Sequence, residues 1–355
     1  MLLARQGHKV LLVDRDMFPS DIMSTHYIHL PGKVRLARWG LLDRVMASGC
    51  PPIPANHLHM GEMEFAPPPP PMPDGLDPQA ISPRRYILDN ILAEAAVEAG
   101  AEFRQGMSVR ELIWDDDRVV GIRAQAKGSA AVEERAKIVI GADGLHSVVA
   151  RNVKPQEYDT IPSLTFAYYT YWSGLTDPDM HIYFFEDKRG ILIFPTHNGQ
   201  ACIGVGGEIE GFAEFKRDIE ANYMKVIDRV PSVSEAVRGG KREERWMGTC
   251  DQPNYFRKPY GPGWALVGDA GYHRDFLTGL GITDAFRDAE YVAQAAHESL
   301  TGARPFDEAM ADYQQKRDTF AKPLYALTTK MAGGIRPEPA DWLAFGATMA
   351  QMINS

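Results

Sequence analysis

The spacing of apolar and polar positions changes several times along the 355 residues of the chain. Residues 2–7 are typical of the last turns of a helix that ends at Gly7. The apolar run VLLVDRD at 10–16 then predicts a short buried strand that ends in acidic residues. A helix that leads into a strand with an acid at its tip is the second half of a βαβ unit, whose first half would be a strand and a glycine-rich turn.

Helical spacing marks two further stretches in the first hundred residues. The first is KVRLARWGLLDRVMASG at 33–49. The second covers 81–100, where we expect Ser82 to cap the helix, Pro83 to take its first position and Gly100 to end it. Between them, the proline run 67–71 predicts an extended connection on the surface.

The pattern beyond residue 100 predicts strands and then a separate antiparallel sheet. Residues 101–128 and 131–144 are typical of strands, and strict alternation follows from Thr165 to Gly207. Residues 214–237 favour helix, GWALVGDAG at 263–271 returns to a buried strand, and helices follow, with 331–355 as an amphipathic closing segment.

These elements indicate an α/β chain with a Rossmann-like domain built from both ends and an inserted antiparallel sheet. We expect residues 1–57, 76–160 and 245–330 to form the discontinuous first domain. Residues 58–75 and 161–244 are expected to form a substrate domain, and 331–355 a helical tail.

Composition narrows the class of protein. Apolar residues make up 45% and charged residues 24%, which is ordinary for a globular chain, and the formal net charge of −9 argues against a nucleic-acid partner. Cys50, Cys202 and Cys250 are far apart and form no CxxC pair, so we expect reduced thiols in a cytoplasmic protein. No apolar run has the length of a membrane span, and no signal peptide is indicated.

The segment GWALVGDAGYHRDFLTGLGI carries the strongest chemical signal. Asp269 follows an apolar strand at its carboxyl tip, and Gly279 and Gly281 introduce a long helix. Ligands of open α/β sheets lie at such tips, where a carboxylate accepts hydrogen bonds from hydroxyls and a helix N-terminus favours negative charge. The alternative is an aspartate in a tight turn whose glycines supply positive φ.

Four segments in this order resemble one family. GDAGYHRDFLTGLGI resembles the GDA motif of FAD-dependent monooxygenases of the para-hydroxybenzoate hydroxylase class. KIVIGADGLHSVVAR is similar to the DG motif of that family, PRRYILDNIL to its Arg-x-x-Leu helix, and VLLVDRD to the second strand of its dinucleotide fold. The resemblance covers the chain from its start to about Glu290.

The resemblance implies a role for specific residues. Asp14 would hold the adenosine ribose, Asp269 the ribityl hydroxyls, and Arg85 and Asp143 would lie near the pyrophosphate, with Arg84 as an alternative to Arg85. Backbone groups at Leu280 and Gly281 would face the flavin ring, with Gly268 and Gly279 shaping the same motif.

Several positions depart from the family pattern. Phe276 stands where the family usually has proline, and Leu280 where it often has glutamine. The arginine of the DG motif falls at Ala150, with Arg151 one place late. The glycine-rich turn expected before VLLVDRD has no counterpart, which a late start would explain, and without it we expect FAD affinity to collapse.

Histidines and aromatic residues are further candidates. His26 and His29 lie where substrate and flavin would meet, either as proton-transfer groups or as polar loop residues that contact the backbone. His57 and His59 share one strand face, but we expect no metal, because no nearby carboxylate or cysteine completes a metal site. His273 is either a cofactor-pocket or a surface residue. Half of the sheet aromatics are expected to line a pocket and half to pack; they are Phe166, Tyr168, Tyr169, Tyr171, Trp172, Tyr183 and Phe184.

The resemblance implies a monooxygenase in which NAD(P)H reduces FAD and dioxygen then hydroxylates an aromatic or polyketide-like molecule. No catalytic side chain is indicated beyond the two candidate histidines, because the flavin would carry the chemistry. A flavin-dependent reductase or halogenase is an alternative within the enzymes, although the WxWxIP motif of flavin halogenases is not present. A flavin-free, non-catalytic scaffold is the alternative outside them, and the pattern does not indicate an oligomeric state.

Overall fold

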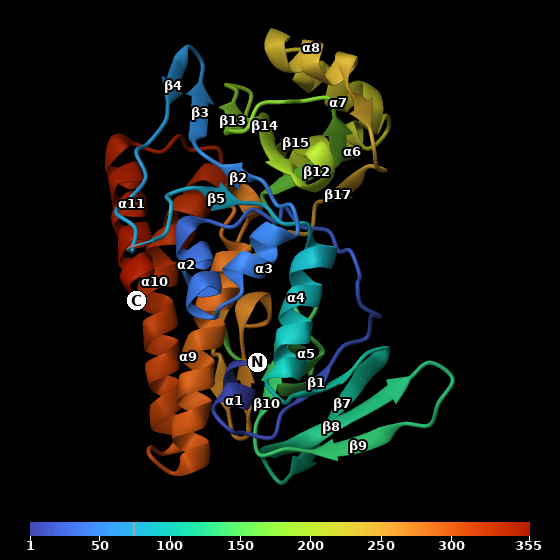
Figure 1. The fold of residues 1–355 in the computed structure, drawn as a ribbon, viewed down its shortest axis with the longest axis vertical. Helices are drawn as coiled ribbons and strands as arrows, with labels where there is room; N and C mark the ends of the chain where they lie inside the picture. The colour runs from blue at the N-terminus through green and yellow to red at the C-terminus, as the bar shows by residue number, and fades with distance from the viewer. Residues whose placement is uncertain (74) are drawn as a thin grey trace.

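The computed structural model describes residues 1–73 and 75–355, and it has a lower α/β body beneath a large upper sheet (Figure 1). Helix α1 (Leu2–Arg5) leads into β1 (Leu11–Val13), which pairs in parallel with β6 (Glu102–Arg104). Strand β10 (Val139–Gly141) pairs in parallel with β20 (Trp264–Leu266), which also pairs with β19 (Tyr260–Gly261). Both ends of the chain therefore build the body, as the pattern predicted.

Two details of the body differ from the expectations. The parallel strands form two separate hydrogen-bonded groups, β1–β6 and β10–β20–β19, rather than one continuous sheet. The helix predicted at 33–49 is two helices, α2 (Leu30–Arg38) and α3 (Leu42–Ala47), because Gly40 adopts a φ of 71° between them.

The expected cap of the 81–100 helix is also wrong. Helix α4 (Arg85–Glu98) begins after Arg84, which has no capping side chain, and Ser82 instead donates to the backbone carbonyl of Pro195 in the upper sheet. Ser82 follows β5 (Ala80–Ile81), which pairs with β2 (Pro52–Ile53). This side-chain hydrogen bond ties the start of α4 to the upper sheet.

The upper sheet has eight strands, seven of them in the order β16–β12–β15–β14–β13–β3–β4, with β17 also paired to β12. Its bounds are Asn56–Met60 (β3), Met63–Phe65 (β4), Thr165–Ser173 (β12), Met180–Phe184 (β13), Gly190–Thr196 (β14), Gln200–Glu208 (β15), Lys241–Arg242 (β16) and Met247–Thr249 (β17). Strand β3 pairs in parallel with β13, and the other pairs are antiparallel, so the alternating segment forms the predicted antiparallel core of the sheet.

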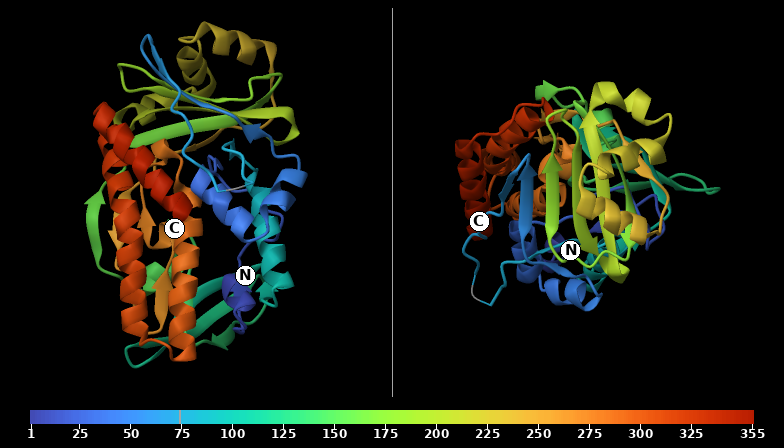
Figure 2. Two further views of the ribbon diagram at one scale, coloured as in Figure 1. Left: turned by 60° about the vertical axis from the view of Figure 1, so that its left-hand side comes forward. Right: turned by 90° about the horizontal axis from the view of Figure 1, so that it is seen from above.

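The two faces of the upper sheet bury different residues. Helices α6 (Phe212–Phe215), α7 (Ile219–Ile227) and α8 (Pro231–Gly239) cover its outer face, as Figure 2 shows, and Pro231 breaks the single helix expected at 214–237. Phe166, Tyr168 and Trp172 pack against these helices, whereas Tyr169 and Tyr171 pack toward the body. The period of two along β12 thus divides its aromatic residues between two cores, and the expectation that half of them line a pocket stays a prediction.

The remaining elements complete the body. Helices α9 (Gly281–Thr301) and α10 (Phe306–Ala332) lie side by side, and α11 (Pro339–Asn354) packs on α2 and α10 (Figure 1). The others are α5 (Val148–Val153), β7 (Met107–Asp115), β8 (Arg118–Ala126), β9 (Val132–Arg135), β11 (Glu157–Ile161), β18 (Asn254–Arg257) and β21 (Tyr272–His273). No helix of the described ranges has the length and apolarity required to cross a bilayer.

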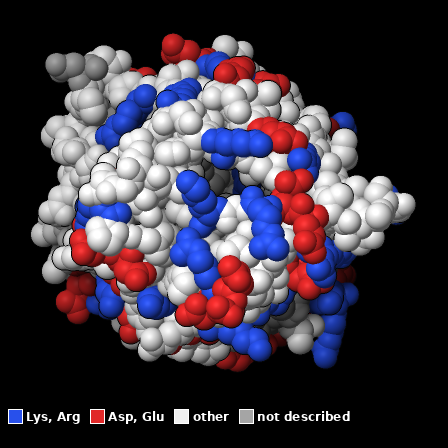
Figure 3. All heavy atoms as spheres, turned by 90° about the horizontal axis from the view of Figure 1, so that it is seen from below, with Lys and Arg blue, Asp and Glu red and all other residues white. Residues whose placement is uncertain are grey.

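Charges of both signs cover the lower end of the molecule. On the face seen from below, Lys and Arg side chains surround a hollow, and Asp and Glu side chains lie beside them (Figure 3). The excess of acidic residues in the composition therefore does not make this face uniformly negative.

Candidate cofactor and substrate site

The segment 268–281, called here the GDA loop, links β20 to α9 at the centre of the molecule. Gly268 and Gly279 adopt φ values of 55° and 60°, which side-chain-bearing residues rarely take, so both turns of the loop require glycine. Asp275 anchors the loop: its carboxylate accepts hydrogen bonds from the Leu277 amide and, at 2.5 Å, from the Thr165 hydroxyl on β12. The loop is therefore tied to the upper sheet.

The N-terminus of α9 is open to a ligand. The helix has 21 residues, and Leu280, which precedes its first residue, makes no capping hydrogen bond through its side chain. A methyl group added at Gly281 would meet no atom within 4 Å. Amide groups at the start of a long helix attract partial negative charge, so this end suits the polar edge of a ring.

Asp269 is placed to accept hydrogen bonds from a ligand. Its backbone carbonyl accepts from the Tyr255 hydroxyl at 2.6 Å, whereas the carboxylate receives no hydrogen bond from residues 1–73 or 75–355. Burial raises the pKa of this carboxyl group, and the neighbouring charge of Asp284 raises it further. A sugar or ribityl hydroxyl would supply the donors that the protein does not.

Arg85 and Asp14 lie on the same side of the molecule as Asp269. Asp14 follows β1 and accepts from the amide of Asp16 at 2.8 Å. Burial raises the pKa of Asp14, and the charge of Asp89 adds to the shift. Arg85 pairs with Asp89 at 2.9 Å and is near enough to Asp269 to lower the pKa of that carboxyl group. The charge of Arg85 thus reaches Asp269, and Asp89 links Arg85 to the surroundings of Asp14, while their roles toward a cofactor stay predictions.

Arg84 lies elsewhere, although it is adjacent to Arg85 in the sequence. Its guanidinium is buried under the upper sheet, where it pairs with Asp21 at 2.8 Å and with Glu244 at 2.6 Å. The central carbon of the guanidinium, Cζ, also lies 3.7 Å from the centre of the Tyr171 ring. The geometry therefore favours Arg85 over Arg84 as the residue near a pyrophosphate.

The DG motif caps the N-terminus of helix α5. The carboxylate of Asp143 accepts from the Ser147 hydroxyl at 2.5 Å and from the Val148 amide at 2.6 Å, which caps this helix. Ala150 is buried, and Arg151 donates to the backbone carbonyl of His146. A contact between Asp143 and a pyrophosphate remains a prediction.

Both candidate histidines of the 26–29 segment are engaged by the protein. His26 hydrogen-bonds the Ser82 carbonyl through Nδ1, so this nitrogen carries the proton and Nε2 accepts from the Tyr171 hydroxyl at 2.9 Å. His29 donates from Nε2 to the Thr278 carbonyl at 2.8 Å. Burial lowers the pKa of His26 to about 3 and that of His29 to about 4, so the geometry favours backbone contact over proton transfer.

The three other histidines that the sequence singled out contact protein groups. Two carboxylates lie beside His57: Glu64 is 2.7 Å from Nδ1 and Asp179 is 3.2 Å from Nε2. His59 instead hydrogen-bonds a histidine of the neighbouring strand, and no group of described residues has the arrangement of a metal site. His273 is buried, and its Nδ1 contacts the Pro253 carbonyl. Strand pairing thus brings Asp179 to His57 from a distant part of the sequence, whereas Glu64 comes from the adjacent strand β4.

Tyr27 was not predicted, and it joins the GDA loop to the inner face of the upper sheet. A methyl group added at Gly279 would lie 3.7 Å from the Tyr27 ring, which on its other side lies 6.0 Å from the ring of Phe194. The core around Tyr27 is mostly apolar; it contains Ile53, Ala80, Tyr169, Tyr171, Met180, Phe194 and Cys202. A signal existed in STHYIHL, where Tyr27 lies between the two histidines.

Comparisons with known proteins agree with this arrangement. The sequence profile described as FAD binding domain matches residues 1–328. The digeranylgeranylglycerophospholipid reductase of Methanosarcina acetivorans is 31% identical over 244 residues, which are 66% of this chain and 57% of that protein. The chain thus spans little more than half the length of this curated relative.

Solved structures show the same fold at lower identity. The myxobacterial chondrochloren halogenase CndH superposes with a TM-score of 0.84 at 21% identity, covering 99% of this chain and 86% of its own. PqsL of Pseudomonas aeruginosa, described as a probable FAD-dependent monooxygenase, has a TM-score of 0.76 at 19% identity and coverages of 100% and 95%. At these identities the likeness concerns the fold alone.

Proposed function

The chain belongs to the FAD binding domain family, and from this premise we propose that it is a flavin-dependent reductase of carbon–carbon double bonds in an apolar, isoprenoid-type substrate. The open N-terminus of α9, the unpartnered Asp269 carboxylate and Arg85 fit the ring, the hydroxyls and the phosphates of FAD. FAD, when bound, supplies the two electrons of the reaction. The residues of the chain hold the cofactor, exclude water and orient the substrate.

The observation that carries the proposal is the buried core beside the GDA loop. It is mostly apolar around Tyr27, and the two nearby histidines are neutral and bound to backbone carbonyls. Apolar surroundings of this kind favour a substrate that carries no charge at its reacting end, because burying a charge without a partner costs free energy. The sequence relative is named for an isoprenoid lipid, which supports this substrate class.

Monooxygenation is the second candidate, and it rests on a different observation. Tyr169 and Tyr171 add aromatic rings to the inner face of the sheet, which suits stacking with an aromatic or polyketide-like substrate. The order of the four sequence motifs also supports this class. In both candidates we propose NAD(P)H as the reductant.

One experiment separates the candidates. The chain is loaded with FAD, reduced with dithionite without oxygen, and mixed with a geranylgeranyl-bearing glycerophospholipid in detergent. We expect the flavin to reoxidise and mass spectrometry to show the lipid gaining pairs of hydrogen atoms. The reductase proposal fails if the lipid is unchanged. In a parallel assay in air with NADH or NADPH, an aromatic product that carries one added oxygen supports monooxygenation instead.

A further inference from the structure

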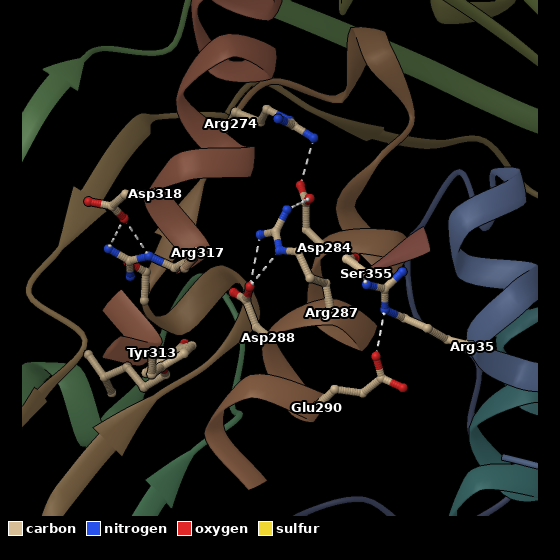
Figure 4. Close-up of polar contacts among 12 residues, drawn as sticks. Arg35, Arg274, Asp284, Arg287, Asp288, Glu290, Tyr313, Arg317, Asp318 and Ser355 are labelled. Atoms are coloured by element: carbon tan, nitrogen blue, oxygen red, sulfur yellow. Dashed lines mark hydrogen bonds and ion pairs between the residues drawn. The ribbon is translucent and has the colours of Figure 1, made fainter. Parts of the chain in front are cut away.

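Four charged side chains are buried together at the start of α9. Asp284 accepts from Arg274 at 2.6 Å and from Arg287 at 2.7 Å, and Arg287 also pairs with Asp288 at 2.8 Å (Figure 4). Each of the four residues is at most 7% exposed. Two cations and two anions balance one another in a region that water does not reach.

This group, called here the α9 charge cluster, lies directly beneath the GDA loop. Arg274 belongs to the loop, and the Asp284 amide donates to the Leu280 carbonyl at 2.8 Å in the first turn of the helix. The charges of Arg274 and Asp284 reach both Asp269 and His29 and act on their pKa values in opposite directions. The cluster therefore acts electrostatically on the place where the flavin ring is expected.

Stability does not account for the cluster. Nη1 of Arg274 and Oδ2 of Asp288 are buried without any hydrogen-bond partner among the described residues. Buried ion pairs often contribute no more stability than apolar residues of similar size, and unpaired buried polar atoms cost free energy. A charge kept at such a cost next to a cofactor loop indicates an electrostatic function.

We propose that Arg274 and Asp284 are positioning residues that set the reduction potential of the bound flavin, Arg274 raising it and Asp284 lowering it. Reduction adds negative charge to the flavin, which a nearby buried cation favours and a nearby buried anion opposes. The inference rests on the FAD binding domain family and on the place of the GDA loop, and it is independent of the substrate.

The test replaces each partner and then both. Arg274→Met leaves the cluster with a net negative charge, and Asp284→Asn leaves it with a net positive charge. At saturating FAD and without oxygen, the ratio of oxidised to reduced flavin is read by visible absorption against a reference dye. We expect roughly fivefold changes in this ratio, toward oxidised flavin in R274M and toward reduced flavin in D284N, with the double variant near the parent chain.

Opposite shifts distinguish electrostatics from damage to the fold. Arg274→Lys keeps the charge and is expected to keep the parent ratio, even if FAD binds more weakly. Arg35, which is buried, and Glu290, which is partly buried, form a second pair at 3.0 Å that shares no hydrogen bond or ion pair with the cluster. Arg35→Met and Glu290→Gln are therefore matched controls, expected to lower the melting temperature but not to move the ratio.

The proposal is overturned by any of three results: R274M and D284N shift the ratio in the same direction, neither shifts it while FAD is bound, or no variant and not even the parent chain binds FAD at saturation. Substrate turnover plays no part in the measurement. Failure of the reductase proposal would therefore leave this result unaffected, and the two proposals fail separately.

Discussion

The guanidinium of Arg84 lies 3.7 Å from the centre of the Tyr171 ring and joins the start of α4 to the inner face of the upper sheet. The ion pairs with Asp21 and Glu244 hold it there, and Tyr171 in turn donates to His26. Arg85, the next residue, points toward Asp89 and the cofactor side. Two arginines that are adjacent in the sequence therefore contact different halves of the molecule.

This arrangement predicts different consequences for two similar substitutions. Arg84→Met removes a buried stacking contact and two ion pairs, so we expect the free energy of unfolding to fall by about 2 kcal/mol. Arg84→Lys keeps the charge but not the planar stack, and an intermediate loss is expected. Arg85→Met removes a partly exposed pair and is expected to cost less than about 1 kcal/mol. Urea unfolding of the three variants checks the order, and equal losses at both positions would contradict it.

For FAD affinity we expect the reverse order: a substitution at Arg85 should have a larger effect than one at Arg84. Asp269→Ala removes the acceptor that we assign to cofactor hydroxyls, so the dissociation constant for FAD should rise by about 10- to 100-fold. Arg85→Met should weaken binding in the same direction, whereas Arg84→Met should change it little. Fluorescence titration of FAD measures all three, with the exposed Asp228→Asn as a control. An unchanged dissociation constant in D269A would remove Asp269 from the cofactor site.

Asp275 predicts a dependence of stability on pH. Burial raises the pKa of Asp275 to about 6, above the value of the unfolded chain, so the folded state binds its proton more tightly. This contribution to stability is present at low pH and is lost as the pH rises through about 6. The unfolding free energy of Asp275→Asn minus that of the parent chain should therefore increase by about 2 kcal/mol between pH 4 and pH 8. A constant difference across this range would show that Asp275 does not titrate as expected.

His26 predicts the opposite dependence. Burial and, to a lesser extent, the charge of Arg84 lower its pKa to about 3, so the folded state binds its proton less tightly than the unfolded chain. Stability is then lost as the pH falls below the unfolded value near 6.5. Relative to His26→Asn, the parent chain should lose about 3 kcal/mol between pH 7 and pH 4. Thermal unfolding scans across these pH values give the measurement, and parallel curves for the two proteins would refute it.

His29 and His197 should add to this acid sensitivity. Burial lowers the pKa of each to about 4. His197 receives the Arg84 amide at Nδ1 and contacts the Ser48 hydroxyl, so its substitution should also loosen the start of α4. We expect His197→Asn to flatten the pH dependence of stability and, unlike His29→Asn, to leave FAD affinity unchanged. The pair of variants therefore separates a structural histidine from one that holds the GDA loop.

Short-range signals in the sequence were enough for the class of fold and for the candidate residues of the cofactor site. Period-two alternation identified the strands that form the core of the upper sheet, and glycines at 279 and 281 marked the start of α9. Asp14, Arg85 and Asp269 were found because a helix start or a strand tip places them by local rules. Capping was less predictable: Ser82 has the right chemistry, but a carbonyl of the upper sheet takes its hydroxyl.

Only the tertiary structure decided which residues act together. The sequence treated Arg84 and Arg85 as alternatives, but the first turn of α4 directs them to opposite sides. It gave no partner for His57, to which strand pairing brings Asp179 across 122 positions. The α9 charge cluster was not predicted, because charged residues at helical spacing normally indicate an exposed face, and only packing of the loop and α10 over α9 buries them. Local patterns depend on neighbours within a few residues, whereas burial and pairing of charges depend on contacts between distant segments that only the complete fold brings together.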